Sequence, residues 1–171
     1  IIDTDYYLNK EKGRIRFVKG IENVKENNDR LYELGTLLNF SKDAEHVGNK
    51  YCISGLSPTE KSGTWTYGNV VDFFFEIEDK LDKDLILFME YSICGEAQRV
   101  KLLVNGNEIT DYVASESERK EVVIPREYIE NNELLLRFEL PDARLPGNGD
   151  QRELALFIRN MKISTEFSEM H

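Results

Sequence analysis

A repeat of apolar side chains at every second position constrains this chain more than any other feature. From residue 31 onward, short segments alternate apolar and polar residues, and each is bounded by Gly, Pro, Asn, Asp or Ser. Such segments are typical of half-buried β-strands separated by turns. The predicted strands cover residues 32–40, 50–54, 70–78, 84–93, 99–105, 120–125, 133–141 and 152–164. Eight or more strands at this spacing predict an all-β fold, an antiparallel, jelly-roll-like β-sandwich.

The rest of the chain offers few helix signals and one clear hairpin. Asn105 and Gly106 form the dipeptide that favours a tight turn between two strands. The stretch 125–132 has room for one helical turn, with Pro125 at its start. We therefore expect the strands to account for nearly all regular structure.

The 171 residues suit a single domain with a short additional segment. We assign residues 31–165 to the β-sandwich, residues 1–30 to a linker or accessory hairpin, and residues 166–171 to a C-terminal tail. Residues 73–75 and 85–88 are apolar at consecutive positions, so both faces of those strands need cover, which the leading residues could supply. The chain starts at Ile1 rather than Met, so we expect it to be an excised part of a longer protein.

The formal net charge of −10 excludes some partners. Nucleic acids and anionic membrane surfaces are bound by basic stripes, and the sequence has no such stripe. No apolar stretch approaches the roughly 20 residues that span a bilayer, so we expect no membrane insertion by this fragment.

Catalytic motifs are missing from the sequence. It contains no nucleophile elbow, phosphate-binding glycine loop or zinc-protease motif. The two histidines, His46 and His171, are poorly placed for acid–base work, and no carboxylate pair is singled out among 32 acidic residues. Cys52 and Cys94 read as buried thiols, with a disulfide as the alternative. We expect no catalytic residues in this fragment.

The single tryptophan, Trp65, supports two interpretations. As a binding platform, its indole and Tyr67 would stack on a sugar ring while Glu60 and Asn69 hydrogen-bond the hydroxyl groups. As a structural residue, it would follow the turn at Gly63 and anchor the core of the sandwich.

The loop before the last predicted strand is a second candidate site. Asp142, Asn148 and Asp150 offer oxygen atoms of the kind that a structural Ca²⁺ binds, although their spacing fits no EF-hand. The alternative is that Asp150 and Arg152 fasten the loop through hydrogen bonds, with a contact from Glu60 to Arg152. We expect no obligatory cofactor.

A third candidate is the strand start at Gln98 and Arg99, together with the turn at Asn105. These side chains would line a polar groove, or they would simply lie along a solvated sheet edge.

Four stretches in order resemble a known domain: SGLSPTEKSGTWTYG, QRVKLLVNGNEI, VVIP and LLLRFELPDARLPGNGDQRELALFIRNMKI. They look like the β-sandwich domain attached to bacterial membrane glycosyltransferases and sulfatase-like phosphoglycerol transferases. The resemblance covers about residues 32–164, and NKEKGRIRFVKG is similar to the segment that joins such a domain to its transferase. The matching positions are Gly55, Glu60, Gly63, Trp65, Gly68, Asn105, Gly106, Pro125, Pro141, Asp150 and Arg152. Ala155 departs from the pattern, because glycine is common there.

The resemblance implies a galactose-binding or carbohydrate-binding-module-like fold on the extracytoplasmic face of a bacterial membrane. It implies a non-catalytic accessory domain that binds a polysaccharide or oligosaccharide beside the other domains of its parent enzyme. The candidate carbohydrate-binding residues are Trp65, Tyr67, Glu60, Asn69, Arg99, Asp150 and Arg152. The alternative is a structural domain that packs against the parent catalytic domain and has no glycan ligand.

Overall fold

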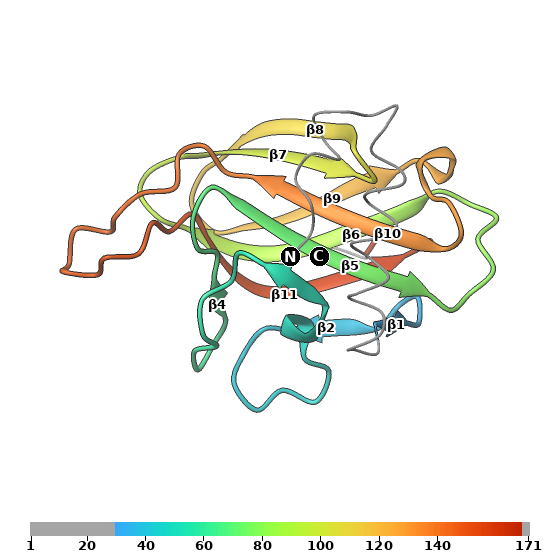
Figure 1. The fold of residues 1–171 in the computed structure, drawn as a ribbon, viewed down its shortest axis with the longest axis horizontal. Helices are drawn as coiled ribbons and strands as arrows, with labels where there is room; N and C mark the ends of the chain where they lie inside the picture. Colours follow the sequence, from blue (N-terminus) through green and yellow to red (C-terminus); the bar gives the residue numbers. More distant parts are fainter. Residues whose placement is uncertain (1–29, 169–171) are drawn as a thin grey trace.

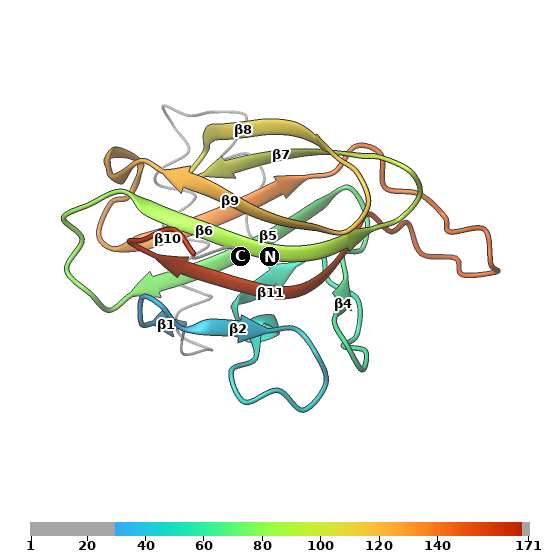
Figure 2. The same cartoon turned by 180° about the vertical axis from the view of Figure 1, so that it is seen from behind.

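The computed structural model describes residues 30–168, which form an antiparallel β-sandwich (Figures 1 and 2). The strands are β1 (Leu31–Tyr32), β2 (Leu37–Asn39), β3 (Cys52–Ser54), β4 (Thr64–Trp65), β5 (Val70–Ile77), β6 (Leu85–Ile93), β7 (Gln98–Val104), β8 (Asn107–Ala114), β9 (Glu118–Ile124), β10 (Glu133–Glu139) and β11 (Leu156–Ser164). Two short 3₁₀ helices, η1 (Gly48–Tyr51) and η2 (Arg126–Tyr128), complete the regular elements of the described residues. The predicted all-β, jelly-roll-like fold is confirmed.

The strands form two sheets that face each other. The six-stranded sheet has the order β1-β5-β10-β7-β8, and β3 shares the outer edge of β5 with β1. The five-stranded sheet has the order β2-β11-β6-β9, and β4 pairs with β11. Figure 1 is viewed from the side of the six-stranded sheet, and Figure 2 from the side of the five-stranded sheet. Every pairing between two named strands is antiparallel except that of β1 with β5.

The core lies between the sheets and follows the alternation of the sequence. Along β5, Phe73 and Phe75 point into it and are fully buried. The Phe73 ring makes edge-to-face contacts with Phe40 and Phe138, with ring centroids 5.9 and 6.1 Å apart. Aromatic pairs in this geometry add to the stabilisation that burial already gives.

The six-stranded sheet also buries side chains on its outer face, the face turned away from the core. Phe74 and Leu135 alternate with core residues on β5 and β10, and both are 0% exposed. Beside them, the Arg137 guanidinium donates two hydrogen bonds of 2.8 Å to the Asp72 carboxylate. The expectation of strands that are apolar on both faces is therefore confirmed for β5. The proposed cover, residues 1–30, lies outside the described residues except for Arg30.

The turn predicted at Asn105 and Gly106 agrees with the structure, whereas the bounds of two predicted strands differ from it. Asn105 and Gly106 both have positive φ angles, 48° and 84°, as a tight hairpin between β7 and β8 requires. The predicted strand 32–40 is split into β1 and β2 by a turn at Gly35, whose φ is +91°. The predicted strand 152–164 begins only at Leu156, because the residues before it belong to a loop that extends away from the sandwich (Figure 1).

Candidate functional site

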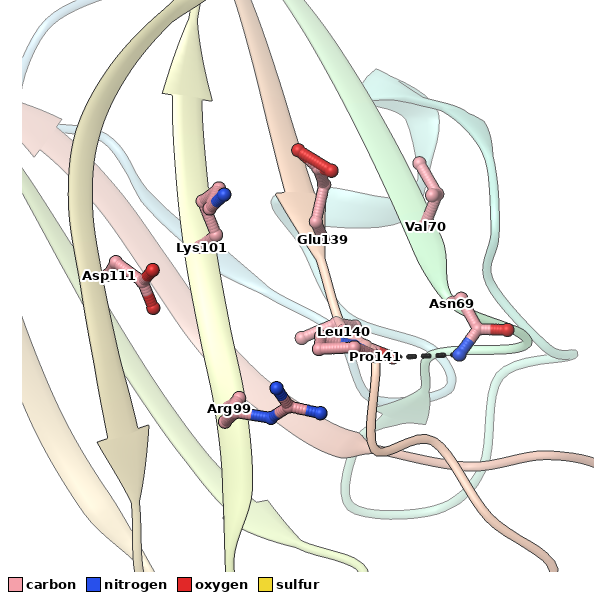
Figure 3. A pocket seen from close by; sticks show the side chains of 8 residues that line it. All are labelled: Asn69, Val70, Arg99, Lys101, Asp111, Glu139, Leu140 and Pro141. Atoms are coloured by element: carbon pink, nitrogen blue, oxygen red, sulfur yellow. Dashed lines mark hydrogen bonds between the residues drawn. The ribbon is translucent and has the colours of Figure 1, made fainter.

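A groove opens on the outer face of the six-stranded sheet, near the end where β5 begins and β10 ends (Figure 3). Its volume is about 450 Å³. The residues that line this groove are Asn69, Val70, Arg99, Lys101, Asp111, Glu139, Leu140 and Pro141. It combines polar groups on several neighbouring strands with an apolar floor, so we treat it as the candidate functional site.

The register of four strands places one row of these side chains across the sheet. Glu139 on β10 pairs with Val70 on β5 and with Lys101 on β7, and Lys101 pairs with Asp111 on β8. Directly opposed residues share a face of the sheet, so the row reads apolar, acidic, basic, acidic. Figure 3 shows the Glu139, Lys101 and Asp111 side chains following one another in this order.

Arg99 is held in position at one end of the groove. Its Nε lies 3.1 and 3.0 Å from the two oxygens of Asp142, and its Nη2 lies 2.7 Å from Oδ1. The backbone N–H of Arg99 donates to the same carboxylate at 3.0 Å. These hydrogen bonds lower the pKa of Asp142 and raise that of Arg99. The bidentate geometry orients the guanidinium, although the pair is exposed and contributes little to stability.

The other charges of the groove are less constrained. Lys101 Nζ lies 3.4 Å from the Glu108 carboxylate. Among residues 30–168, Glu139 and Asp111 have no ion-pair partner of their own, and Asp111 only adds a longer-range attraction to Arg99. Both carboxylates are thus available to accept hydrogen bonds from a ligand.

Asn69 and Leu140 join the loop before β5 to the end of β10. The Leu140 N–H donates to the backbone oxygen of Asn69 at 2.7 Å, and Asn69 Nδ2 donates to the Leu140 oxygen at 3.0 Å. The amide oxygen of Asn69 points away from this contact (Figure 3). Val70 and Pro141 give the groove an apolar floor beside these polar groups.

This arrangement suits the binding of a polar ligand better than catalysis. It offers a fixed guanidinium, an ammonium, two carboxylates and an amide around an apolar surface, the mixture found in sites for small polar ligands. A glycosidase would need two carboxyl groups that converge on one bond, with one of them in apolar surroundings. Here Lys101 stands between Glu139 and Asp111, and Asp111 is exposed.

The structure brings two of the seven predicted binding residues into the groove, Asn69 and Arg99. Three charged lining residues were not singled out from the sequence: Lys101, Asp111 and Glu139. The alternation of residues 99–105 and 133–141 already put Lys101 and Glu139 opposite to the core positions, whereas Asp111 lies on β8, outside these segments. What the sequence lacked was the strand order, which places β10, β7 and β8 side by side.

Trp65 lies neither in the groove nor in the core. It pairs with Phe157 of β11 on the side of the five-stranded sheet opposite the core residues Leu156 and Ile158. The rings of Trp65 and Phe157 are 5.0 Å apart at 57°, and the indole is half-buried. The prediction that Trp65 anchors the core of the sandwich is therefore wrong, because Trp65 lies on the outer face of the five-stranded sheet.

The remaining predicted residues lie in loops. Arg152 binds Asp150, with Nη2 to Oδ2 at 2.5 Å and Nε to Oδ1 at 2.9 Å, while Glu60 adds a weaker electrostatic attraction. The Arg152 guanidinium lowers the pKa of Asp150 to about 2. Tyr67 is 53% exposed, two residues before Asn69 in the chain. The interpretation in which Asp150 and Arg152 fasten the loop agrees with this geometry.

The candidate metal ligands do not converge. Asp142 binds Arg99, Asp150 binds Arg152, and the Asn148 side-chain oxygen accepts the Asp150 N–H at 3.1 Å. Within residues 30–168 there is no group of three or more His, Cys, Asp or Glu side chains that could hold a metal ion.

Both cysteines are free thiols. Burial raises the pKa of Cys52 to about 12, so its thiol stays protonated and unreactive at neutral pH. Cys94 is buried, and its pKa is also raised by burial.

No helix within residues 30–168 has the length and apolar character needed to cross a bilayer.

Comparison with known proteins gives only distant structural likenesses. No family model matches the sequence, and no curated protein does. Among solved structures, the CBM36-1 domain of a multidomain xylanase from the Trinervitermes trinervoides hindgut metagenome has a TM-score of 0.44 and 13% identity, covering 78% of this chain and 98% of that one. A family 35 carbohydrate-binding module from Clostridium thermocellum has a TM-score of 0.45 and 10% identity, covering 77% and 100%. A CBM36 module in complex with calcium and xylotriose has a TM-score of 0.38 and 10% identity, covering 63% and 83%. At these values the likenesses identify neither a ligand nor a binding site for this chain.

Proposed function

We propose that this domain binds an oligosaccharide or polysaccharide in the groove on the outer face of the six-stranded sheet. The observation that carries the proposal is the lining of the groove. A row of charged side chains on β10, β7 and β8 crosses the sheet beside an apolar floor, and Arg99 is fixed at one end. Sugar rings present hydroxyl groups at their edges and C–H groups on their faces, and the groove offers partners for both.

The charge of the groove favours a neutral glycan or one that carries amino groups. Arg99 and Lys101 are already paired with Asp142 and Glu108, whereas Glu139 and Asp111 have no ion-pair partner among residues 30–168. An anionic polysaccharide would meet these two carboxylates in a chain whose net charge is −10.

The wider role that we propose rests on the ordered motifs described above. The domain would be a non-catalytic accessory part of a cell-surface polysaccharide-synthesising transferase, on the extracytoplasmic face of a bacterial membrane. Weak binding of one sugar segment would be enough, because the link to the parent enzyme raises the effective concentration of acceptor at its active site.

The test is calorimetric titration with a panel of neutral and amino-containing oligosaccharides. Xylotriose belongs in the panel, since it is the sugar in one of the structures compared above. For a glycan that binds, Arg99→Ala and Glu139→Gln should each weaken binding by roughly 10-fold or more, because each removes a charge-assisted hydrogen bond.

The matched control is Arg119→Ala. Arg119 pairs with Glu90 at 2.7 Å on the five-stranded sheet, and its side chain is 60% exposed, as that of Arg99 is. Equal weakening by Arg99→Ala and Arg119→Ala would place the binding site elsewhere. A panel in which no sugar binds would favour the structural role beside a parent catalytic domain.

A further inference from the structure

The charged side chains that cross the groove alternate in sign. Glu139 on β10 is directly opposite Lys101 on β7, and Lys101 is directly opposite Asp111 on β8. Neighbouring strands lie about 5 Å apart, so the strand positions of the two carboxylates are about 10 Å apart, with the lysine between them. Figure 3 shows the three side chains in this order. The groove therefore presents two separate acidic positions rather than one acidic cluster.

Both acidic positions are open to a ligand. The Lys101 ammonium lies 3.4 Å from Glu108, and no ion pair joins it to Glu139 or Asp111. Asp111 is exposed and Glu139 is half-buried, and both line the groove. A carboxylate that is partly removed from water gains most from a charged hydrogen-bond donor.

The basic residues of the groove do not balance its acidic ones. Arg99 is bound by Asp142, as Lys101 is by Glu108. With these partners, the groove carries two basic side chains against four acidic ones: Arg99 and Lys101 against Asp142, Glu108, Glu139 and Asp111. The excess of negative charge attracts a ligand that carries ammonium groups, and the position of each carboxylate determines where those groups bind.

This inference rests on the function proposed above and specifies the ligand. We propose that the groove binds an amino-sugar chain laid across the strands, with one ammonium group at Glu139, a second at Asp111 and an uncharged unit at Lys101. In an extended chain of glucosamine units, alternate units face the same way and are separated by about the distance between these two strands. Lys101 repels an ammonium group on the central unit, whereas it donates a hydrogen bond to an acetamido or hydroxyl oxygen there. Val70, beside Glu139 in the row, contacts the C–H groups of a sugar ring.

The test is calorimetric titration of the full chain with three chitosan trisaccharides that differ only in acetylation. One has three free amino groups, one is acetylated at all three units, and one is acetylated at the central unit alone. The centrally acetylated form should bind most tightly, roughly 10-fold or more above the fully acetylated form, because it gains two charge-assisted hydrogen bonds. Added salt should reduce this preference.

Three variants assign the preference to individual residues. Glu139→Gln and Asp111→Asn should each reduce the ratio between the affinities for the centrally and the fully acetylated forms. Lys101→Gln should raise the affinity for the form with three free amino groups. Glu116→Gln is the control, because it removes one negative charge at an exposed position between β8 and β9 and should leave the ratio unchanged.

This inference and the proposed function fail in different ways. If the fully acetylated form binds as tightly as the other two and Arg99→Ala weakens it, the groove is a glycan site that does not recognise ammonium groups, and only this inference is overturned. A preference for three free amino groups would overturn the role of Lys101. A trilysine peptide that binds more tightly than every trisaccharide would overturn both, since the groove would then be a site for basic peptides.

Discussion

Single residues decide how the loop before β4 meets the five-stranded sheet. Gly63 passes so close to β11 that a Cβ atom there would lie 2.7 Å from the Ile158 backbone oxygen and 2.7 Å from a carbon of the Phe157 ring. The Phe157 ring in turn contacts Trp65. Glycine at position 63 therefore sets the position of the only tryptophan in the chain.

Gly63→Ala should destabilise the domain and change the environment of Trp65. The new methyl group would have to displace either a strand backbone or an aromatic ring, which costs about 1–3 kcal/mol and lowers the unfolding midpoint by roughly 2–10 °C in a domain of this size. Calorimetry and Trp65 emission measure the two effects. Ser62→Ala, at the exposed neighbouring position, should change neither. An unchanged midpoint for Gly63→Ala would mean that the loop does not pack on β11 as described.

The residue scale is also where prediction from sequence was weakest. The residue types in the groove are common ones, and only Asn69 and Arg99 were singled out beforehand. Trp65 drew attention because it is unique, yet uniqueness does not indicate which face of a sheet a side chain occupies. That depends on the pairing of β4 with β11, which joins segments about 90 residues apart.

At the scale of elements, the loop between β10 and β11 is held by two arginine–carboxylate pairs. Arg99 binds Asp142 where the loop leaves β10, and Arg152 binds Asp150 shortly before β11. Arg144 and Leu154, on the two arms of the same loop, exchange backbone hydrogen bonds of 2.9 and 2.8 Å. The loop is thus fastened at its base, and its tip extends away from both sheets (Figure 1).

The carboxyl group of Asp150 should titrate well below its ordinary range. Its pKa is lowered to about 2 by hydrogen bonds from the Arg152 side chain and backbone. A lowered native pKa means that the contact contributes above the ordinary value near 4 and is lost as the pH falls through about 2. A carbon-13 NMR titration should show this, and Arg152→Met should raise the pKa of Asp150 towards its ordinary value. Arg126→Met, in η2, should leave it unchanged. An ordinary pKa in the natural chain would show that the pair does not form in solution.

Elements were predicted from the sequence more reliably than site residues. Strands β5, β6, β7, β9 and β10 match their predicted segments within a few residues, because their alternation is long and bounded by turn residues. β1 to β4 are only two or three residues long, so period-two patterns could not define them. To predict the groove, both the strands and their order in the sheet would have to be known. No local sequence pattern encodes the order in which distant strands pair.

At the scale of the whole molecule, a partly buried hydrogen-bond cluster links the two sheets. Tyr91 on β6 of the five-stranded sheet and Tyr112 on β8 of the six-stranded sheet bring their hydroxyl groups within 2.7 Å. The Tyr91 hydroxyl also lies 2.9 Å from the Glu118 carboxylate on β9. Burial is the main cause that raises the pKa of Tyr112 to about 12, and it also raises the pKa of Tyr91. The two sheets are therefore joined by phenols that resist ionisation.

This cluster should make the domain sensitive to alkaline pH. A tyrosine ionises near pH 10 in the unfolded chain, so a native pKa of about 12 gives stability that is complete below pH 10 and declines as the pH rises towards 12. For Tyr112 the decline amounts to about 2–3 kcal/mol in the free energy of unfolding, and Tyr91 adds to it.

The Tyr112→Phe variant distinguishes two contributions to stability: the hydrogen bond between Tyr91 and Tyr112, and the ionisation of Tyr112. At pH 8 the variant should be less stable by about 1 kcal/mol, because Tyr91 loses one partner but keeps Glu118. Towards pH 11 the difference should shrink, since the variant no longer has a phenol at position 112 to ionise. Urea unfolding at the two pH values measures this, with Tyr67→Phe as the exposed control. A constant difference between natural chain and variant would mean that Tyr112 ionises equally easily in the folded and the unfolded state.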